Sequence, residues 1–371
     1  MGQEVIAGLG SSEKIADVLN DLGTSKFLLV CESSYQYLTN RDVIEAIPTP
    51  HVKFSDFTPN PLYEQVCTGV GMFNSNACDA IVAVGGGSTI DVAKCIKLYC
   101  KMDVAKLYLE QPMVDTGIPL IAVPTTAGTG SESTRHAVIY YEGKKQSISH
   151  ESIVPDYAIL DATVLKTLPL YQKKCTMLDA LSQAIESWWS VNSTEETIRY
   201  SRNAIDLIMS NWREYIESNT DTSAEQIMLA ANYAGRAINI TATTAAHAMS
   251  YKLTSIYHLP HGHAVAVCLP HVWRYMNQHL DKCIDARGAE YLAGTLEDIS
   301  HEMGYNSSAK AVEMFEQLLR ILEIKNPQRK SDADIDILTA SVNLLRLKNN
   351  PVSLNSYTLR ILYEQIVKES K

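Results

Sequence analysis

Apolar residues recur along this chain with two different periods. Up to about residue 160, short runs of apolar and β-branched residues alternate with segments of helical periodicity. Because helical segments separate the runs, we expect a parallel sheet that is covered by helices on both faces. The predicted strands of this sheet are residues 27–31, 52–54, 80–84 and 120–123.

Two local signals refine the first part of the chain. Ser11 is expected to cap a helix with apolar positions at helical spacing, and Gly23 is expected to end it. The pair Glu142-Gly143 lies between residues 136–141 and 145–149, and this pattern predicts an antiparallel hairpin.

From about Leu168 the pattern changes to long amphipathic helices with almost no strand signal. The proline of Thr167-Leu168-Pro169 marks the change, since proline restricts the residue before it. We therefore predict a Rossmann-like α/β domain over residues 1–166 and an all-α domain over residues 167–371. The expected helices of the second domain are residues 178–190, 197–216, 224–237, 246–257, 308–322 and 356–368, and residues 331–334 are expected to form a polar loop or a helix start.

Composition narrows the range of partners. The chain has 371 residues and a formal net charge of −10, which gives no electrostatic footprint for nucleic acid or an anionic membrane. No apolar stretch approaches the roughly 20 residues that span a bilayer, and the first residues lack a basic and apolar leader. Eight cysteines without a CxxC pair fit reduced thiols. We expect a cytoplasmic protein without nucleic-acid or membrane partners.

Two glycine-rich and hydroxyl-rich segments each follow a predicted strand. Residues 85–94 read GGGSTIDVAK, and residues 124–132 read PTTAGTGSE. Glycines let the backbone approach a pyrophosphate, and the following helix start offers free N–H groups and the positive end of its dipole. Two such loops at the carboxyl ends of parallel strands predict a dinucleotide site. The expected contacts are Gly86, Gly87, Ser88, Asp91, Thr125, Thr126, Thr129 and Ser131.

A carboxylate ends the first predicted strand. Glu32 could accept hydrogen bonds from the adenosine ribose and repel a 2′-phosphate. Its position therefore favours NAD(H) over NADP(H).

Residues with metal-ligand chemistry gather in the second part. Asp179 and Gln183 are four residues apart and share a face of one predicted helix. His247 and Tyr251 have the same spacing on another helix, and His261 is expected in a loop. Two imidazoles and a carboxylate suit Zn²⁺ or Fe²⁺, whereas the amide oxygen of Gln183 would be a neutral, weaker donor.

The motifs and their order resemble those of the iron-containing (group III) alcohol dehydrogenases over nearly the whole chain. Besides the two loops, the matching pieces are Pro59-Asn60-Pro61, Pro155-Asp156, Thr167-Leu168-Pro169, Asp179-Ala180-Leu181 and Pro260-His261-Gly262. The resemblance implies a nucleotide-binding lobe, a helical lobe, NAD(H), a metal held by one aspartate and three histidines, and a homodimer or larger assembly. It also implies cofactor contacts at Asn60, Lys145 and Leu168.

Three metal ligands of that family carry over onto Asp179, His247 and His261. Gln183 stands where the family usually has a histidine, so we expect weakened binding of Fe²⁺ or Zn²⁺. Tyr251 stands where the family often has another active-site histidine. These departures leave the nucleotide motifs untouched.

Within the family, three segments look like those of the phosphonoacetaldehyde reductases of phosphonate biosynthesis. They are DAL-x-Q-AIES, TTAAHA-x-SY-x-LTS and PHGHAVA. The resemblance implies NADH-dependent reduction of phosphonoacetaldehyde to 2-hydroxyethylphosphonate, in which the metal polarises the aldehyde oxygen. The resulting alkoxide must gain a proton. Tyr251 is the expected donor, with His258 or the nicotinamide ribose hydroxyl as a relay.

A phosphonate carries close to two negative charges and needs cationic partners when it is enclosed. Arg135 follows the second loop closely and offers a planar fork. Lys145 and His150 lie on or beside the predicted hairpin, and His263 lies in PHGHAVA. We expect these residues to hold the substrate anion, with Arg135 first.

Three alternatives stay open, and the remotest of them is a non-enzymatic binding module, against which the two phosphate loops and the polar cleft argue. A reductase of the same family that acts on lactaldehyde, succinate semialdehyde or an alkanal would be distinguished by a substrate panel. A lyase similar to dehydroquinate synthase would share the two-lobe architecture, although that family lacks PTTAGTGSE. Stoichiometric NADH oxidation distinguishes a reductase from this lyase, because a synthase regenerates its cofactor.

Overall fold

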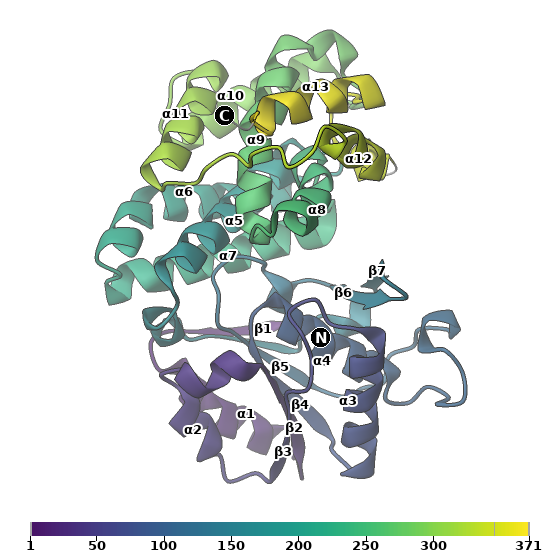
Figure 1. Cartoon of the computed structure of the whole chain (residues 1–371). Coiled ribbons are helices and arrows are strands. Elements are labelled where there is room, and N and C mark those ends of the chain that lie inside the picture. Colours follow the sequence, from purple (N-terminus) through teal and green to yellow (C-terminus); the bar gives the residue numbers. More distant parts are fainter. Residues whose placement is uncertain (1, 345, 370–371) are drawn as a thin grey trace. The chain divides into compact units, whose positions relative to one another are not determined.

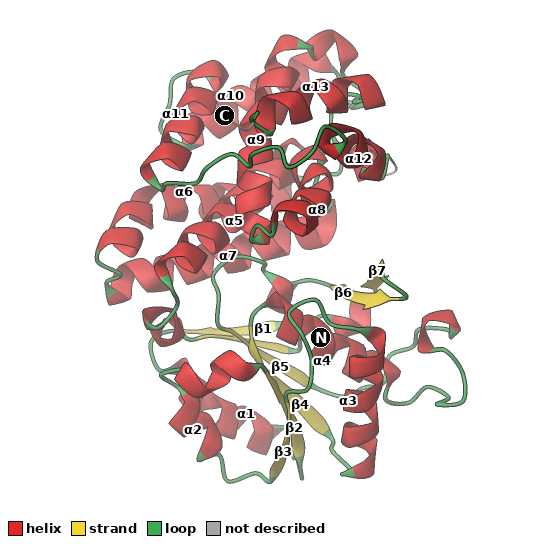
Figure 2. Cartoon of the chain, in the orientation of Figure 1, coloured by secondary structure: helices red, strands yellow, loops and turns green. Residues whose placement is uncertain are grey.

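The computed structural model describes residues 2–344 and 346–369. The chain divides into two compact units, one of Met1–Pro169 with Glu217–Gly235 and one of Leu170–Ile216 with Arg236–Lys371. The first unit holds a parallel sheet, and the second is helical (Figure 1 and Figure 2). The predicted fold class is confirmed. The expected boundary between residues 166 and 167 stays a prediction.

Six parallel strands form the sheet of the first unit. The four predicted strands are among them, with bounds that agree within one residue. The pattern does not predict β1 (Glu4–Ala7) and β8 (Tyr157–Leu160). The strand order is β1 (Glu4–Ala7), β8 (Tyr157–Leu160), β5 (Leu120–Pro124), β4 (Ala80–Gly85), β2 (Phe27–Cys31) and β3 (His51–Phe54).

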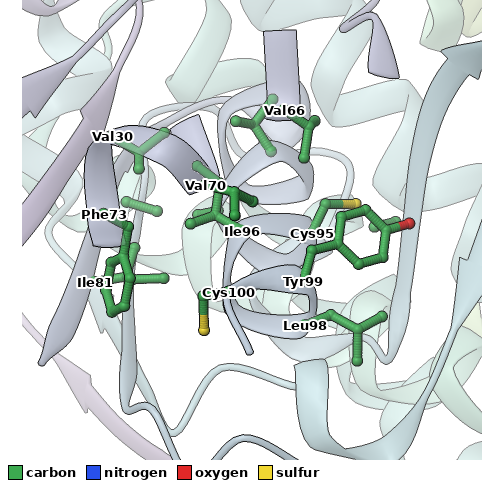
Figure 3. Close-up of a cluster of buried hydrophobic side chains, with 14 of the residues drawn as sticks. Val30, Val66, Val70, Phe73, Ile81, Cys95, Ile96, Leu98, Tyr99 and Cys100 are labelled. Carbon is green, nitrogen blue, oxygen red and sulfur yellow. The ribbon is translucent and has the colours of Figure 1, made fainter. Parts of the chain in front are cut away.

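Both faces of this sheet are buried, because alternate residues of β2 and β4 belong to two separate cores. The helices α3 (Tyr63–Ser75) and α4 (Gly87–Tyr99) cover one face. The helices α1 (Lys14–Asp21) and α2 (Arg41–Glu45) pack on the other. Figure 3 shows the first core, in which apolar side chains of α3 and α4 meet those of β2 and β4.

The two local predictions in this unit have different outcomes. The hairpin is confirmed as β6 (His136–Tyr141) and β7 (Lys144–Ser149), and both residues of its turn have positive φ, as a two-residue turn of this kind requires. The cap at Ser11 is wrong. Ser11 begins a 3₁₀ turn, and α1 starts at Lys14 without a side-chain cap, although Gly23 follows its end with φ 66°.

Long helices follow the sheet along the chain, and the six predicted helices are all present. Most of them belong to the second unit, whereas α7 begins in the first unit and ends in the second. None of the helices in the described residues is long and apolar enough to cross a bilayer. The pattern does not predict α9 and α10, whereas α12 begins at Asp334, as the helix start expected within residues 331–334 allows. The bounds are α5 (Leu170–Trp189), α6 (Glu195–Glu217), α7 (Asp221–Thr241), α8 (Ala245–Tyr257), α9 (His261–Gln278), α10 (Ala289–Glu302), α11 (Ser308–Ile321), α12 (Asp334–Ser341) and α13 (Ser356–Ile366).

The helix α9 corrects the expected loop at His261. His261 is the first residue of this helix, and Pro260 precedes it as the N-cap residue with extended backbone. Pro270 lies inside α9 and has no N–H to donate within the helix. The apolar run around Pro270 is buried on nearly all sides, so it shows no amphipathic period.

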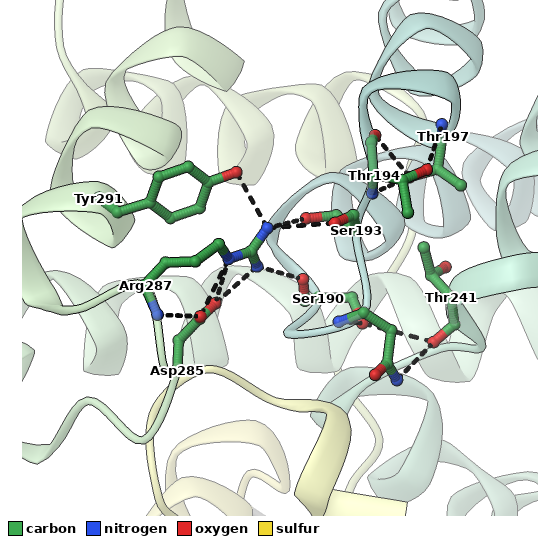
Figure 4. Close-up of polar contacts among 9 residues, drawn as sticks. Ser190, Ser193, Thr194, Thr197, Thr241, Asp285, Arg287 and Tyr291 are labelled. Carbon is green, nitrogen blue, oxygen red and sulfur yellow. Dashed lines mark hydrogen bonds and ion pairs between the residues drawn. The ribbon is translucent and has the colours of Figure 1, made fainter.

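One guanidinium joins the end of α5 to the segment before α10 (Figure 4). Arg287 donates hydrogen bonds to the Ser190 carbonyl at 2.8 Å and to the Ser193 hydroxyl at 2.8 Å. Its ion pair with Asp285 spans 2.6 Å, and it stacks on the Tyr291 ring at 4.2 Å. A lysine cannot meet these partners at once, because it lacks the planar fork.

Two backbones approach closely within the first unit. A Cβ atom built on Gly235 of α7 would lie 2.6 Å from the carbonyl oxygen of Gly130 and 2.7 Å from its Cα. Gly130 itself has φ 61°, which side chains rarely allow. The loop with the sequence PTTAGTGSE therefore rests directly on α7.

We expect Gly235→Ala to destabilise the protein by roughly 1–3 kcal/mol, because the added methyl forces two backbones apart. Gly71→Ala is the matched control. Gly71 also lies in a helix of the first unit, and a Cβ there meets nothing within 4 Å. This control should stabilise slightly, by about 0.5–1 kcal/mol. Denaturant unfolding of both variants measures the difference, and equal effects would contradict the close approach.

Candidate metal centre and nucleotide-binding loops

The two glycine-rich loops of the first unit touch each other. A Cβ atom on Gly87 would lie 2.9 Å from side-chain atoms of Thr129, and one on Gly86 would lie 3.8 Å from Thr126. The Thr125 N–H donates to the Gly85 carbonyl at 3.0 Å. Because β4 and β5 are neighbours, the two loops form one surface at the carboxyl edge of the sheet.

The start of α4 is open toward an anion. Its N-cap residue is Gly86, which has no side chain that could accept a hydrogen bond from the first turn. The N–H groups of a first turn have no partner within the helix and carry the positive end of its dipole. This arrangement suits a pyrophosphate.

A buried lysine that sequence reasoning missed ties the two loops together. Lys94 of α4 is fully buried and donates hydrogen bonds to Ser131 at 3.0 Å, Thr134 at 3.0 Å and the His136 carbonyl at 2.7 Å. Burial lowers the pKa of its ammonium group to about 8, although Asp91 opposes the shift. The signal in the sequence is a lysine between the apolar residues Ala93 and Cys95, and such a lysine needs internal acceptors when it is buried.

Asp91 and Ser131 bind each other in this network. The Ser131 hydroxyl donates to Asp91 at 2.7 Å, and the Val138 N–H donates to the other Asp91 oxygen at 2.9 Å. Both residues thus hold the loops in place, and their expected contact with the cofactor stays a prediction.

Glu32 lies at the same sheet edge as the glycines. Cys31 pairs with Val84, so the next residues, Glu32 and Gly85, are also neighbours across the two strands. The Ser34 hydroxyl donates to the Glu32 carboxylate at 3.1 Å. Glu32 is partly exposed and remains open to a further donor.

The other predicted cofactor contacts lie in three separate places. Asn60 is exposed in the loop before α3, and this loop contacts α4 through a hydrogen bond from Ser88 to the Pro59 carbonyl. Lys145 lies on β7, and Leu168 lies in the segment before α5. Their roles stay predictions.

Three predicted ligands of the second unit come together. The ligand atoms of Asp179, His247 and His261 all lie within 4.8 Å of one another. His247 Nε2 is 3.4 Å from Asp179 Oδ1, and His261 Nε2 is 3.9 Å from the same oxygen. Ligands at 2.0–2.2 Å from a shared tetrahedral ion lie about 3.4 Å apart, so this spacing suits Zn²⁺ or Fe²⁺.

The polar atoms of this cluster also fit a cation. Asp179 Oδ1 and His247 Nε2 are buried and make no hydrogen bond within the described residues. Burial alone would lower the pKa of His247, but the Glu186 and Asp179 carboxylates outweigh it and raise the pKa to about 9. Burial likewise opposes the low pKa of Asp179, which His261 and His247 cause. The site therefore favours a positive charge.

A glycine permits the approach that brings His261 to Asp179. A Cβ atom on Gly262 would lie 2.0 Å from the Cys175 carbonyl oxygen and 2.9 Å from the Asp179 Cβ. The start of α9 thus packs directly on α5. This contact explains why the motif Pro260-His261-Gly262 ends on glycine.

Gln183 and Tyr251 lie beside the cluster. Gln183 is buried one turn after Asp179. Burial raises the pKa of the Asp179 carboxylate, but His261 and His247 lower it more, and a hydrogen bond from Gln183 contributes to the lowering. The Tyr251 ring stacks on His261 with centroids 5.8 Å apart. Gln183 as a fourth ligand and Tyr251 as a proton donor stay predictions.

His258 lies apart from this group. It is exposed at the end of α8 with φ 55°, and seven residues, or roughly 10 Å of helix, separate it from Tyr251. The structure therefore does not support the expected proton relay through His258.

Arg135 and His150, two of the predicted anion contacts, each have a partner within the chain. Arg135 is half-buried and forms an ion pair with Glu151. The His150 ring accepts a hydrogen bond from the Ser152 N–H and so caps a 3₁₀ turn. Arg135 and His150 both stay predictions as contacts of a substrate anion.

His263 does not fit the expected anion site. It is buried, its Nε2 donates to the Lys325 carbonyl at 2.8 Å, and its Nδ1 lies 2.7 Å from the Tyr171 hydroxyl. A carbonyl only accepts, so the neutral ring must accept from Tyr171. Burial also lowers the pKa of His263. Both nitrogens thus serve the packing of the second unit.

Comparison with known families decides the membership of the chain. Residues 2–162 match the family described as iron-containing alcohol dehydrogenase, and residues 174–367 match its C-terminal domain. The chain belongs to the iron-containing alcohol dehydrogenase family. The predicted family and two-lobe architecture are thereby confirmed, and they agree with the predicted oxidoreductase class.

Individual relatives of this iron-containing alcohol dehydrogenase are moderately similar. The "Probable alcohol dehydrogenase EutG" of Escherichia coli is 36% identical over 220 residues, 58% of this chain and 56% of that protein. The chain thus matches little more than half of that relative's length. The NAD-dependent methanol dehydrogenase of Bacillus methanolicus is 32% identical over 281 residues, 72% of each chain.

One solved structure is similar over nearly the whole chain. The sulfoacetaldehyde reductase from Bifidobacterium kashiwanohense, solved in complex with NAD⁺, is 25% identical. It has a TM-score of 0.88, and the match covers 98% of this chain and 96% of that chain.

We expect His247→Ala and His261→Ala to lose bound metal after dialysis and to reduce kcat by roughly 100-fold, since each removes an imidazole ligand from a charge-stabilising centre. His301→Ala is the control, because His301 is exposed on α10. Elemental analysis and NADH oxidation on the same samples measure both effects. Full activity of the unmodified protein after chelation would contradict a role of metal in the reaction.

Proposed function

We propose that this protein reduces phosphonoacetaldehyde to 2-hydroxyethylphosphonate with NADH. The observation that carries the proposal is the cluster of Asp179, His247 and His261, whose ligand atoms all lie within 4.8 Å of one another. Two of these atoms, Asp179 Oδ1 and His247 Nε2, are buried and make no hydrogen bond within the described residues. The glycine-rich loops and the NAD⁺ complex of the sulfoacetaldehyde reductase support the cofactor. That relative also acts on a two-carbon aldehyde with an anionic group, as its name states.

The two groups from outside the chain have separate tasks. A divalent metal held by Asp179, His247 and His261 would supply Lewis-acid polarisation of the aldehyde oxygen. NADH would supply the hydride, while the protein binds and orients it. Gly86, Gly87 and the open start of α4 hold the pyrophosphate in this account.

The remaining step for the protein is proton delivery. Tyr251 lies one turn after His247 on α8 and stacks on His261, so its hydroxyl is the group we assign to this step. A phenol near a metal can give up its proton as negative charge develops on the substrate oxygen. Gln183 holds the Asp179 carboxylate through a hydrogen bond.

Arg135 is the group we assign to the substrate anion. It follows the second loop and is half-buried, and its partner Glu151 is largely exposed. An exposed ion pair is worth little, so a phosphonate can replace Glu151 at small cost. The planar guanidinium also matches the oxygens of a phosphonate.

A second candidate reaction is the reduction of sulfoacetaldehyde. The likeness to the sulfoacetaldehyde reductase favours it, at 25% identity. A sulfonate carries one charge where a phosphonate carries close to two. NADH oxidation with both aldehydes, propanal, lactaldehyde and succinate semialdehyde decides between the candidates, and equal rates with all five would contradict an anion site.

We expect the unmodified protein to prefer NADH over NADPH, because Glu32 repels a 2′-phosphate. Glu32→Ala should lower the ratio of kcat/KM with NADH to kcat/KM with NADPH by at least about tenfold. Glu64→Ala is the control, since Glu64 is exposed in the same unit at the start of α3. Equal use of both cofactors by the unmodified protein would remove the role of Glu32.

We expect Arg135→Ala to lower kcat/KM for phosphonoacetaldehyde by roughly 30- to 1000-fold, the scale of losing one partner of an enclosed charge pair. Propanal has no anion, so its kcat/KM should stay within about threefold. Glu151→Gln removes the competing partner and should raise kcat/KM for phosphonoacetaldehyde by less than about fivefold. An unchanged ratio of the two substrates in Arg135→Ala would move the anion site to Lys145 or His150.

A further inference from the structure

A carboxylate without an assigned role lies next to the metal cluster. Glu186 is on α5 and is 0% exposed. It follows Asp179 by seven residues, which is close to two helical turns, so both carboxylates lie on one face of α5. Within the described residues, its ion pair is with the imidazole of His247 and not with a lysine or arginine.

One oxygen of Glu186 holds the start of α8. Oε1 accepts hydrogen bonds from the Thr244 hydroxyl at 2.6 Å, the Ala246 N–H at 2.9 Å and the His247 N–H at 3.4 Å. First-turn N–H groups have no partner within their own helix. Glu186 therefore fixes the first turn of α8, which carries His247, against α5.

The other oxygen of Glu186 contacts the His247 ring. Oε2 is bonded to Nδ1. A carboxylate only accepts, so the proton lies on Nδ1. The opposite nitrogen, Nε2, is buried without a hydrogen bond and is 3.4 Å from Asp179 Oδ1. The two oxygens of one carboxylate thus set both the position of the His247 backbone and the nitrogen that faces Asp179.

We propose that Glu186 is a positioning residue for the metal centre, which holds the His247 ring through Nδ1 and so keeps Nε2 directed toward Asp179 and available to the metal. The inference rests on the metal centre of the proposed function and is independent of the substrate. Carboxylates behind a histidine ligand typically contribute 10- to 100-fold to metal affinity. Glu186 is not a metal ligand in this account, but its effect on metal affinity can be measured in the same way as that of a ligand.

The substitution Glu186→Gln distinguishes the roles of the two carboxylate oxygens. Its amide oxygen can still accept from Thr244 and Ala246, which places the amide nitrogen against Nδ1 of His247. Nδ1 must then accept, and the proton moves to Nε2. We expect the Kd of the metal-depleted protein for Zn²⁺ to rise roughly 10- to 100-fold in calorimetric titration, while the melting temperature without metal changes little.

Thr244→Val is the matched control. It removes a hydrogen bond to Oε1 and the acceptor of the Trp189 indole at 2.9 Å, but leaves the contact of Oε2 with His247. We expect a lower melting temperature and a Kd for Zn²⁺ within about threefold of the unmodified protein. A loss of affinity equal to that of Glu186→Gln would reduce Glu186 to a structural role and overturn the inference.

A spectroscopic measurement on the His247 ring of the unmodified protein tests the inference even if Glu186→Gln fails to fold. In the unmodified protein loaded with Zn²⁺, ¹⁵N–¹H spectra should show a proton on Nδ1 of His247 and the metal on Nε2. Zinc on Nδ1, or an unchanged Kd in Glu186→Gln, would overturn the inference and leave the metal centre in place. An unmodified protein that binds no Zn²⁺ would overturn both proposals.

Discussion

The second unit depends on how α5 accommodates two buried carboxylates. Removing a carboxylate from water costs several kcal/mol unless donors or cations replace the water. Glu186 finds its donors at the start of α8, and Asp179 lies beside His247 and His261. Satisfying these two charges thus requires α8 and α9 to begin at the same face of α5. The candidate metal centre is the place where these helices meet.

Glycines set the corresponding constraints on backbone distance. Gly262 lets α9 reach α5, and in the first unit Gly87 lets the two loops touch. Lys94 then holds the second loop through three hydrogen bonds from inside α4. In both units, residues of the family motifs thus set the geometry of a site.

The sequence predicts much of this fold, because the strands β2, β4 and β5 are continuous apolar runs and most helices are amphipathic. It also brings Asp179, His247 and His261 together through the resemblance of their motifs. It fails at α9, whose residues are buried on nearly all sides and include Pro270, so that no helical period is visible. It also leaves Glu186 and Lys94 without roles, since their partners are distant in sequence and only folding shows them. The partners of His263 are likewise visible only in the folded chain, where Tyr171 and the Lys325 carbonyl contact its ring nitrogens.

The most direct test of the metal centre is a crystal structure of the protein grown with Zn²⁺ or Fe²⁺, with anomalous diffraction recorded at the absorption edge of the metal. The account predicts one strong peak about 2.0–2.2 Å from Asp179, from Nε2 of His247 and from His261, with Nδ1 of His247 still bonded to Glu186. A peak elsewhere in the chain, or coordination through Nδ1 of His247, would contradict the account.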